Sequence, residues 1–159
     1  WGTDAAAFGI GADETQHVLW RLQDRELADM QPRTVVLLIG TNNFGIGNAS
    51  GKETFSGIAA VVEQLVSLLP NTQIVVLALL PRKRKGTFKT QMAYTNSHLS
   101  TLCTEHLSHR LHFLDCGNVF LDSQSEIIKD LMPDFLHPSA KGAEALFKDC
   151  LGPFIRRLG

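Results

Sequence analysis

The sequence has no long apolar run and almost no excess of either charge. Its 15 Lys and Arg residues nearly balance its 16 Asp and Glu residues, leaving a formal net charge of -1 at pH 7. Such a chain is a poor candidate for a nucleic-acid-binding protein that works through bulk positive charge. No apolar segment approaches the roughly 18 residues of a membrane-spanning helix, and no basic-then-apolar segment marks a secretory leader. We therefore expect no nucleic-acid partner and no membrane span.

Cysteine is scarce as well. Only Cys103, Cys116 and Cys150 occur, widely separated and without the spacing of a metal site. An odd number of isolated cysteines is typical of a reducing compartment, in which each would be a buried thiol. Glu105 and His109 are four residues apart, but their spacing supplies no third ligand. The sequence therefore predicts a cytoplasmic protein without a metal ion.

What the chain does contain is enough apolar residues for a core, at 44% of 159 residues. That length suits one domain. Short apolar runs alternate with segments of helical periodicity, a pattern that predicts a parallel sheet with helices on both faces. The predicted strands are 5–11, 34–39, 73–80 and 111–115, and the predicted helices are 13–27 with Asp13 as cap, 58–69 ended by Pro70, 91–108, and one capped by Ser139 with a kink at Gly152-Pro153.

The run 34–39 is unbroken in its β-branched and leucine residues, as in a strand buried on both faces. It stops at Gly40 and is followed by Thr41, Asn42 and Asn43. Parallel sheets place their chemistry in loops at the carboxyl ends of the strands. Asn42 could there donate its amide N–H to an oxygen that gains charge in a transition state. The alternative is a turn, since asparagine tolerates left-handed backbone.

A second candidate pair lies in PDFLHPS, residues 133–139. Asp134 and His137 are three residues apart, just before the last predicted helix. At that spacing Asp134 can accept a hydrogen bond from one imidazole nitrogen and orient the other outward as a base. The alternative is an ion pair in a loop, or a hydrogen bond at the start of a helix.

Several blocks of the sequence occur in a fixed order. They are FGIGADETQHVLWRL (8–22), VVLLIGTNN (35–43), LALLPR (77–82), Asn96, HFLD (112–115) and MPDFLHPSAKG (132–142). Together they resemble the SGNH, or GDSL-type, hydrolases, and among these the catalytic subunits of the intracellular platelet-activating-factor acetylhydrolase and similar bacterial esterases. The resemblance implies a three-layer α/β/α, flavodoxin-like fold over one domain, residues 1–159, and hydrolysis of an acyl or acetyl ester, which could be a lipid.

By this resemblance His137 is the general base, Asp134 is the acid that orients it, and Asn42 is an oxyanion-hole donor. Ala12 stands where relatives carry the oxyanion-hole glycine, whose backbone N–H is the donor. Alanine can supply the same N–H, although positive φ there would cost about 1 kcal/mol or more. The family implies no cofactor and no metal, and its members often form homo- or heterodimers or larger assemblies.

The family's nucleophile is missing from the sequence. That serine belongs to a Gly-Asp-Ser motif at the end of the first strand, and the chain contains no such triplet. In the family that strand lies between the second and third, so we expect the domain to be N-terminally incomplete here. The serine would then come from a segment outside these residues or from another polypeptide. The alternative is a catalytically inactive, SGNH-fold structural or interaction subunit of a larger assembly.

Three further features leave alternatives open. Residues 82–85 are four consecutive basic residues after a predicted strand. They suit a solvated loop, an anionic substrate or partner, or a nuclear-import-like signal. Trp20 is expected in the core or a subunit interface, and His17 is expected to be packed and hydrogen-bonded.

Overall fold

The computed structural model describes residues 5–24, 26–27, 29–83, 87–106 and 108–158. Within them a parallel sheet has the order β1-β2-β3. Its strands are β1 (Thr34–Leu37), β2 (Gln73–Leu77) and β3 (Leu111–Leu114). The helices are α1 (Thr15–Gln23), α2 (Thr41–Gly45), α3 (Gly51–Leu68), α4 (Phe88–Glu105), a 3₁₀ turn (Gly117–Phe120), α5 (Ala140–Leu146), a π turn (Phe147–Leu151) and α6 (Gly152–Arg157).

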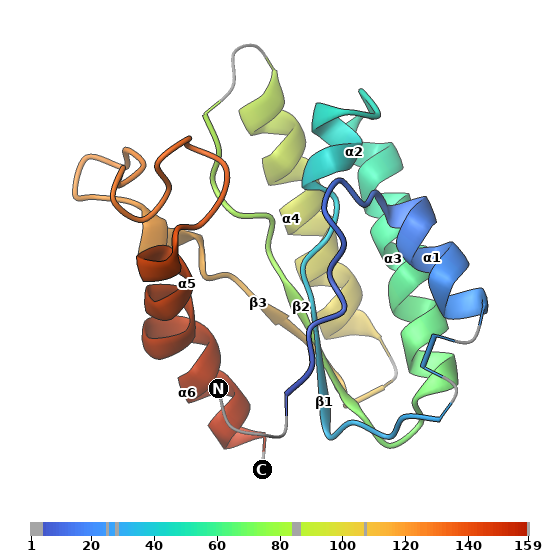
Figure 1. The fold of residues 1–159 in the computed structure, drawn as a ribbon. Coiled ribbons are helices and arrows are strands. Elements are labelled where there is room, and N and C mark those ends of the chain that lie inside the picture. The colour runs from blue at the N-terminus through green and yellow to red at the C-terminus, as the bar shows by residue number, and fades with distance from the viewer. Residues whose placement is uncertain (1–4, 25, 28, 84–86, 107, 159) are drawn as a thin grey trace.

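Helices cover both faces of the sheet (Figure 1). On one face α1, α3 and α4 pack Val62 and Leu99 against Ile74 and other sheet residues. On the opposite face Val75 packs against Leu151 of the C-terminal helices. The alternating apolar segments therefore form three layers, and the predicted α/β/α fold class is confirmed.

One prediction about the sheet is wrong: β1 is not buried on both faces. Val36 is 38% exposed, and Leu38, just beyond the strand, is 42% exposed. The exposure is on one face only: Val35 and Leu37 pack on the face covered by α1, α3 and α4, whereas the apolar cluster under the C-terminal helices includes no β1 residue. In addition, β1 is the outer strand of the described sheet and pairs only with β2. The predicted strand 5–11 is also wrong. These residues form no strand in the described structure, and Phe8 and Ile10 are exposed. We call the unpaired side of β1, with Val36 and Leu38, the open edge.

The start of α1 also differs from the prediction. Glu14, rather than Asp13, is the N-cap, and the Glu14 backbone N–H donates to Nδ1 of His17. Asp13 instead forms an ion pair with Arg21, with 2.6 Å between carboxylate oxygen and guanidinium nitrogen. His17 is thus hydrogen-bonded as expected, but its side chain is 53% exposed rather than packed. Trp20 is 64% exposed and is not a core residue.

Two other helix boundaries follow the predicted signals. Helix α3 begins earlier than its apolar stripe because Ser50 and Glu53 form a reciprocal capping box. It ends immediately before Leu69 and Pro70, as expected from a residue that cannot continue a helix. At α5, the Ser139 hydroxyl accepts from the Gly142 backbone N–H at 3.1 Å, so Ser139 is the cap.

The last helix contains the interruption that Gly152-Pro153 predicts. A π turn occupies Phe147–Leu151, and an α-helical segment resumes at Gly152 with Pro153 in its first turn. Proline is tolerated there because its missing N–H would have no partner in the first turn.

The expectation of three buried thiols is wrong for two of them. Cys116 and Cys150 form a disulfide that joins the end of β3 to the C-terminal helices. Cys103 is a free, buried thiol, and burial raises its pKa to about 11. Thus one cysteine behaves as predicted, while the other two cross-link elements far apart in sequence.

Among the described residues, no helix combines the length and the apolar character needed to cross a bilayer.

Candidate functional site

Gly40 explains why the chain leaves β1 where it does. Its φ is +115°, a left-handed conformation that L side chains rarely adopt. A Cβ at this position would lie 2.9 Å from Cδ1 of Ile58 and 3.0 Å from Cγ2 of Thr54. Glycine therefore permits both the reversal and the close approach to α3, and α2 starts at the next residue with Asn42 and Asn43 in its first turn.

Asn43 is a buried structural anchor. It is 6% exposed, its Oδ1 accepts from the Thr15 backbone N–H at 3.1 Å, and its Nδ2 donates to Thr15 Oγ1 at 3.0 Å. The Thr15 N–H belongs to the first turn of α1, where backbone donors have no partner within the helix. Asn43 therefore ties α2 to the start of α1.

Asn42 lies beside the segment that contains Ala12. Its Nδ2 donates to the Asp13 carbonyl at 3.0 Å, and Ala12 is the residue before Asp13. Ala12 has φ of +68°, the positive φ that a glycine at this position would accommodate without strain. The two predicted oxyanion-hole residues are thus brought together through Asp13.

Asp134 and His137 form the predicted pair. His137 Nδ1 and Asp134 Oδ2 are 2.6 Å apart, and Asp134 Oδ1 accepts from the backbone N–H groups of His137 and Leu136 at 2.8 and 3.0 Å. These bonds, chiefly the one from the His137 backbone and then the one to its ring, lower the pKa of Asp134 to about 2. The pair leaves Nε2 as the ring nitrogen available for proton transfer. The side chain of His137 is 73% exposed, so this nitrogen is accessible to a substrate.

The first two residues of the basic segment 82–85 connect these two parts of the site, a role that the sequence did not reveal. Arg82 donates through Nη1 to the carbonyl and hydroxyl oxygens of Thr41, at 2.8 and 2.9 Å. The next residue, Lys83, donates its backbone N–H to the Phe135 carbonyl at 3.0 Å. Thr41 precedes Asn42, and Phe135 lies between Asp134 and His137. Residues 82–83 therefore bridge the asparagine turn and the Asp-His turn. Arg84 and Lys85 of the predicted basic loop lie outside the described residues.

Asn96 supports the same end of the sheet from α4. Its Oδ1 accepts from the Leu79 backbone N–H at 2.9 Å, and its Nδ2 donates to the Leu79 carbonyl at 3.2 Å. Leu79 follows β2 and leads into the bridging segment. One partly buried amide thus satisfies both backbone groups of a residue that has left the sheet.

No serine in the described part of the chain hydrogen-bonds to His137. Ser139, two residues away, has its hydroxyl occupied, since it donates to the Asp130 carbonyl at 2.8 Å while accepting from Gly142. The described residues therefore hold the predicted base, its orienting acid and two candidate oxyanion donors without a nucleophile.

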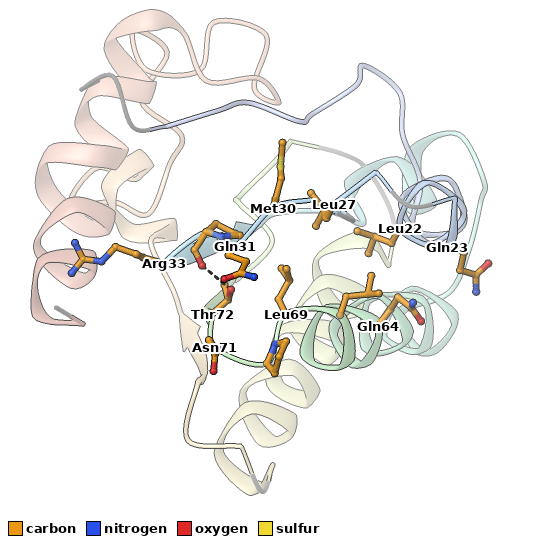
Figure 2. A pocket seen from close by; sticks show the side chains of 13 residues that line it. Leu22, Gln23, Leu27, Met30, Gln31, Arg33, Gln64, Leu69, Asn71 and Thr72 are labelled. Carbon is orange, nitrogen blue, oxygen red and sulfur yellow. Dashed lines mark hydrogen bonds between the residues drawn. The ribbon is translucent and has the colours of Figure 1, made fainter.

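Two hollows differ in their relation to this site. One, of about 460 Å³, adjoins Ala12 and has apolar walls from Ile10 and Trp20. The other, of about 570 Å³, lies at the amino ends of β1 and β2 and is lined by Leu22, Leu27 and Leu69 among others (Figure 2). Its described lining includes no carboxylate and no histidine. The described lining of neither hollow includes Asn42, Asp134 or His137, and of the predicted site residues only Ala12 lines the first hollow.

The chain is similar in sequence to proteins of one known family. The GDSL-like Lipase/Acylhydrolase family matches residues 2–145. The chain is 39% identical over 140 residues to platelet-activating factor acetylhydrolase IB subunit alpha1 of Homo sapiens, covering 87% of this chain and 58% of that one. It is 35% identical over 144 residues to the human alpha2 subunit, covering 91% of this chain and 61% of that one. The chain thus spans less than two thirds of the length of these relatives.

Solved structures share the fold at lower identity. A Streptococcus pneumonia structure whose description names a platelet activating factor superposes with a TM-score of 0.79 at 23% identity, covering 94% of this chain and 72% of that one. A GDSL-like lipase from Bacteroides thetaiotaomicron gives 0.70 at 15% identity, covering 94% and 74%. These similarities bear on the fold alone.

Proposed function

The chain belongs to the GDSL-like lipase/acylhydrolase family, and we propose that it is the base-bearing part of an ester hydrolase that uses Ser-His-Asp covalent catalysis. The observation that carries the proposal is the Asp134–His137 pair, with 2.6 Å between carboxylate and imidazole, joined by residues 82–83 to the turn that holds Asn42. Family membership makes hydrolysis the class of reaction. The residue roles are our inference from the geometry.

In the proposed reaction a serine hydroxyl attacks the acyl carbonyl while His137 Nε2 takes the hydroxyl proton. Asp134, ionised because its pKa is about 2, holds the imidazole through Nδ1 and stabilises the imidazolium that forms. The Asn42 amide and the Ala12 backbone N–H stabilise the oxyanion. His137 then passes its proton to the leaving alcohol, and water releases the acyl group by the same route in reverse. No cofactor and no metal take part.

The serine is proposed to lie outside the 159 residues, on a strand that pairs with the open edge. Val36 and Leu38 support this placement because they are 38% and 42% exposed at the side of β1 that lacks a neighbour. A further strand would cover these side chains and pair the backbone groups that β1 leaves unpaired. Exposed edges of this kind favour strand addition. Peptide mapping of a fluorophosphonate-labelled serine distinguishes a strand that precedes these residues from one that a companion chain supplies.

Hydrolysis of 4-nitrophenyl acetate by the natively purified protein tests the assignment of the base. His137→Ala should lower kcat/KM by about 10²- to 10⁴-fold, because it removes general base catalysis. The matched control is His109→Ala, which changes an exposed histidine outside the site. Turnover that survives in His137→Ala, with both variants folded, would overturn the proposal.

A second candidate function is a structural or interaction subunit that kept the fold without catalysis. It is favoured by the absence of a Gly-Asp-Ser triplet and by the strained φ of Ala12. Its partner would bind the open edge, and homo- or heterodimers or a larger assembly would result. Replacing Leu38 by Lys should then abolish assembly, whereas His137→Ala should leave assembly intact. Loss of ester turnover in His137→Ala would decide against this candidate.

A further inference from the structure

Lys83 lies against the turn that contains the proposed base. Its backbone N–H donates to the Phe135 carbonyl at 3.0 Å, and its Nζ is 4.9 Å from the centre of the Phe135 ring. Phe135 is held at φ of +58° between Asp134 and His137. Two independent contacts, one from the backbone and one from the side chain, therefore fix the Lys83 ammonium beside this turn. The side chain remains exposed, so a bound molecule can reach it.

The charges around Lys83 favour an anion. Arg82 adds a second positive charge, bonded to Thr41 on the other side of the site and positioned over the Phe88 ring at 4.8 Å. The carboxylate in the same turn, Asp134, is already bonded by the His137 ring and by two backbone N–H groups. Its charge is thus offset within the turn, beside which the Lys83 side chain is exposed.

The direction of proton transfer decides which part of an ester would meet Lys83. A histidine base returns its proton to the leaving alcohol, so the alcohol lies on the histidine side of the scissile bond. The acyl oxygen points instead toward the oxyanion donors, Asn42 and Ala12. Lys83 belongs to the histidine side because both of its contacts are to Phe135.

We propose that Lys83 is a specificity residue that selects esters whose alcohol portion carries a negative charge, such as a sulfonate or phosphate group. This inference rests on the proposed function, since it assigns the alcohol side from the role of His137. It gives a role to the exposed charge of Lys83, which the backbone contact to Phe135 does not explain.

The expected effect is modest because Lys83 is exposed. Exposed charge pairs contribute up to about 1 kcal/mol, which corresponds to roughly a fivefold change in a rate ratio. The effect should also weaken with added salt, since charges are screened over about 8 Å at physiological ionic strength. A preference of three- to fivefold that falls with salt is therefore the signature to measure.

The test compares 4-acetoxybenzenesulfonate with the neutral 4-acetoxybenzenesulfonamide as substrates. Lys83→Met should lower kcat/KM for the sulfonate about three- to fivefold and leave the sulfonamide unchanged, while Lys83→Arg should retain the preference. Lys148→Met, which removes an exposed charge from the C-terminal helices, is the matched control. Equal effects on the two esters, or the same preference lost in Lys148→Met, would overturn the inference.

A binding measurement separates this inference from the proposed function. The product 4-hydroxybenzenesulfonate should shift the NMR signals of Lys83 and Phe135, whereas 4-hydroxybenzenesulfonamide should not. Failure of the wild type to hydrolyse either ester would overturn the proposed function, and shifts at Lys83 would still support an anion site. Turnover of both esters without shifts at Lys83 would overturn the anion site and keep the hydrolase.

Discussion

Asn42 and Asn43 are adjacent in sequence but should respond to replacement in opposite ways. Asn43 is buried, and both atoms of its amide bond to Thr15. Asn43→Ala removes its two hydrogen bonds to Thr15, each worth about 1 kcal/mol, and a longer one of 3.4 Å to Gln16 Oε1, and it leaves a buried donor without a partner. The expected loss of stability is about 2 to 4 kcal/mol. For a domain of this size that loss lowers Tm by roughly 5 to 15 °C.

Asn42→Ala has the reverse signature. It removes one hydrogen bond, to the Asp13 carbonyl, from a partly exposed side chain, so stability should fall by no more than about 1 kcal/mol. If the Asn42 amide also stabilises the oxyanion, kcat should fall by about 10²- to 10³-fold. We therefore expect Asn43→Ala to lower stability and Asn42→Ala to lower kcat.

The assay pairs urea denaturation, followed by circular dichroism, with hydrolysis of 4-nitrophenyl acetate. Asn71→Ala, an exposed asparagine before β2, is the control and should change stability by no more than about 0.5 kcal/mol. Unchanged stability in Asn43→Ala would refute the anchor assigned to it. Full turnover in Asn42→Ala would refute the oxyanion role.

Three further predictions concern other parts of the site and the fold. The pKa of Asp134 is lowered from 3.8 to about 2, so its contribution to stability should be complete above pH 3.8 and lost as pH falls through 2. A ¹³C titration of its carboxyl group should show a midpoint near 2 that rises only partway toward 3.8 in His137→Ala, because the variant loses the ring contact but keeps the backbone N–H bonds. A midpoint near 3.8 in the wild type would contradict the contacts. The Cys116–Cys150 disulfide closes a loop of 34 residues, so replacing both cysteines by serine should lower the free energy of unfolding by roughly 3 to 4 kcal/mol. Thermal or urea unfolding measures this loss, and an unchanged midpoint would contradict a stabilising role of the disulfide. Gly40→Ala should destabilise by about 1 to 3 kcal/mol, because positive φ and contact with Ile58 both disfavour a Cβ, and a neutral effect would show that the turn is not so constrained.

The layers of the fold could be predicted because they follow from local patterns. The apolar stripe of α3 and the continuous run of β2 each specify their element without reference to the rest of the chain. Ser139 likewise carries its own capping signal. What could not be predicted is burial that depends on a neighbour. The β1 run has the composition of a doubly buried strand, yet Val36 is exposed because the apolar cluster under the C-terminal helices does not extend to β1.

In the candidate site, too, local contacts were predictable and tertiary contacts were not. The Asp134–His137 spacing is local, so the pair was predictable and its hydrogen bond is present. The partners of Asp13 and Asn43 are set by tertiary packing. Asp13 pairs with Arg21 instead of capping α1, and Asn43 bonds to a residue 28 positions away.

The contacts of the basic segment and of the cysteines also depend on tertiary packing and could not be predicted from the sequence. Arg82 and Lys83 bind two different turns, which a run of positive charge does not reveal. The pairing of Cys116 with Cys150 depends on packing between β3 and the last helices and has no signature in their spacing.

The most direct test of the central claim is labelling of the natively purified protein with a serine-reactive fluorophosphonate, followed by peptide mapping. The account predicts one labelled serine on a peptide outside these 159 residues, with labelling strongly reduced in His137→Ala and unchanged in His109→Ala. A label on a serine within the 159 residues, or labelling that does not depend on His137, would contradict it.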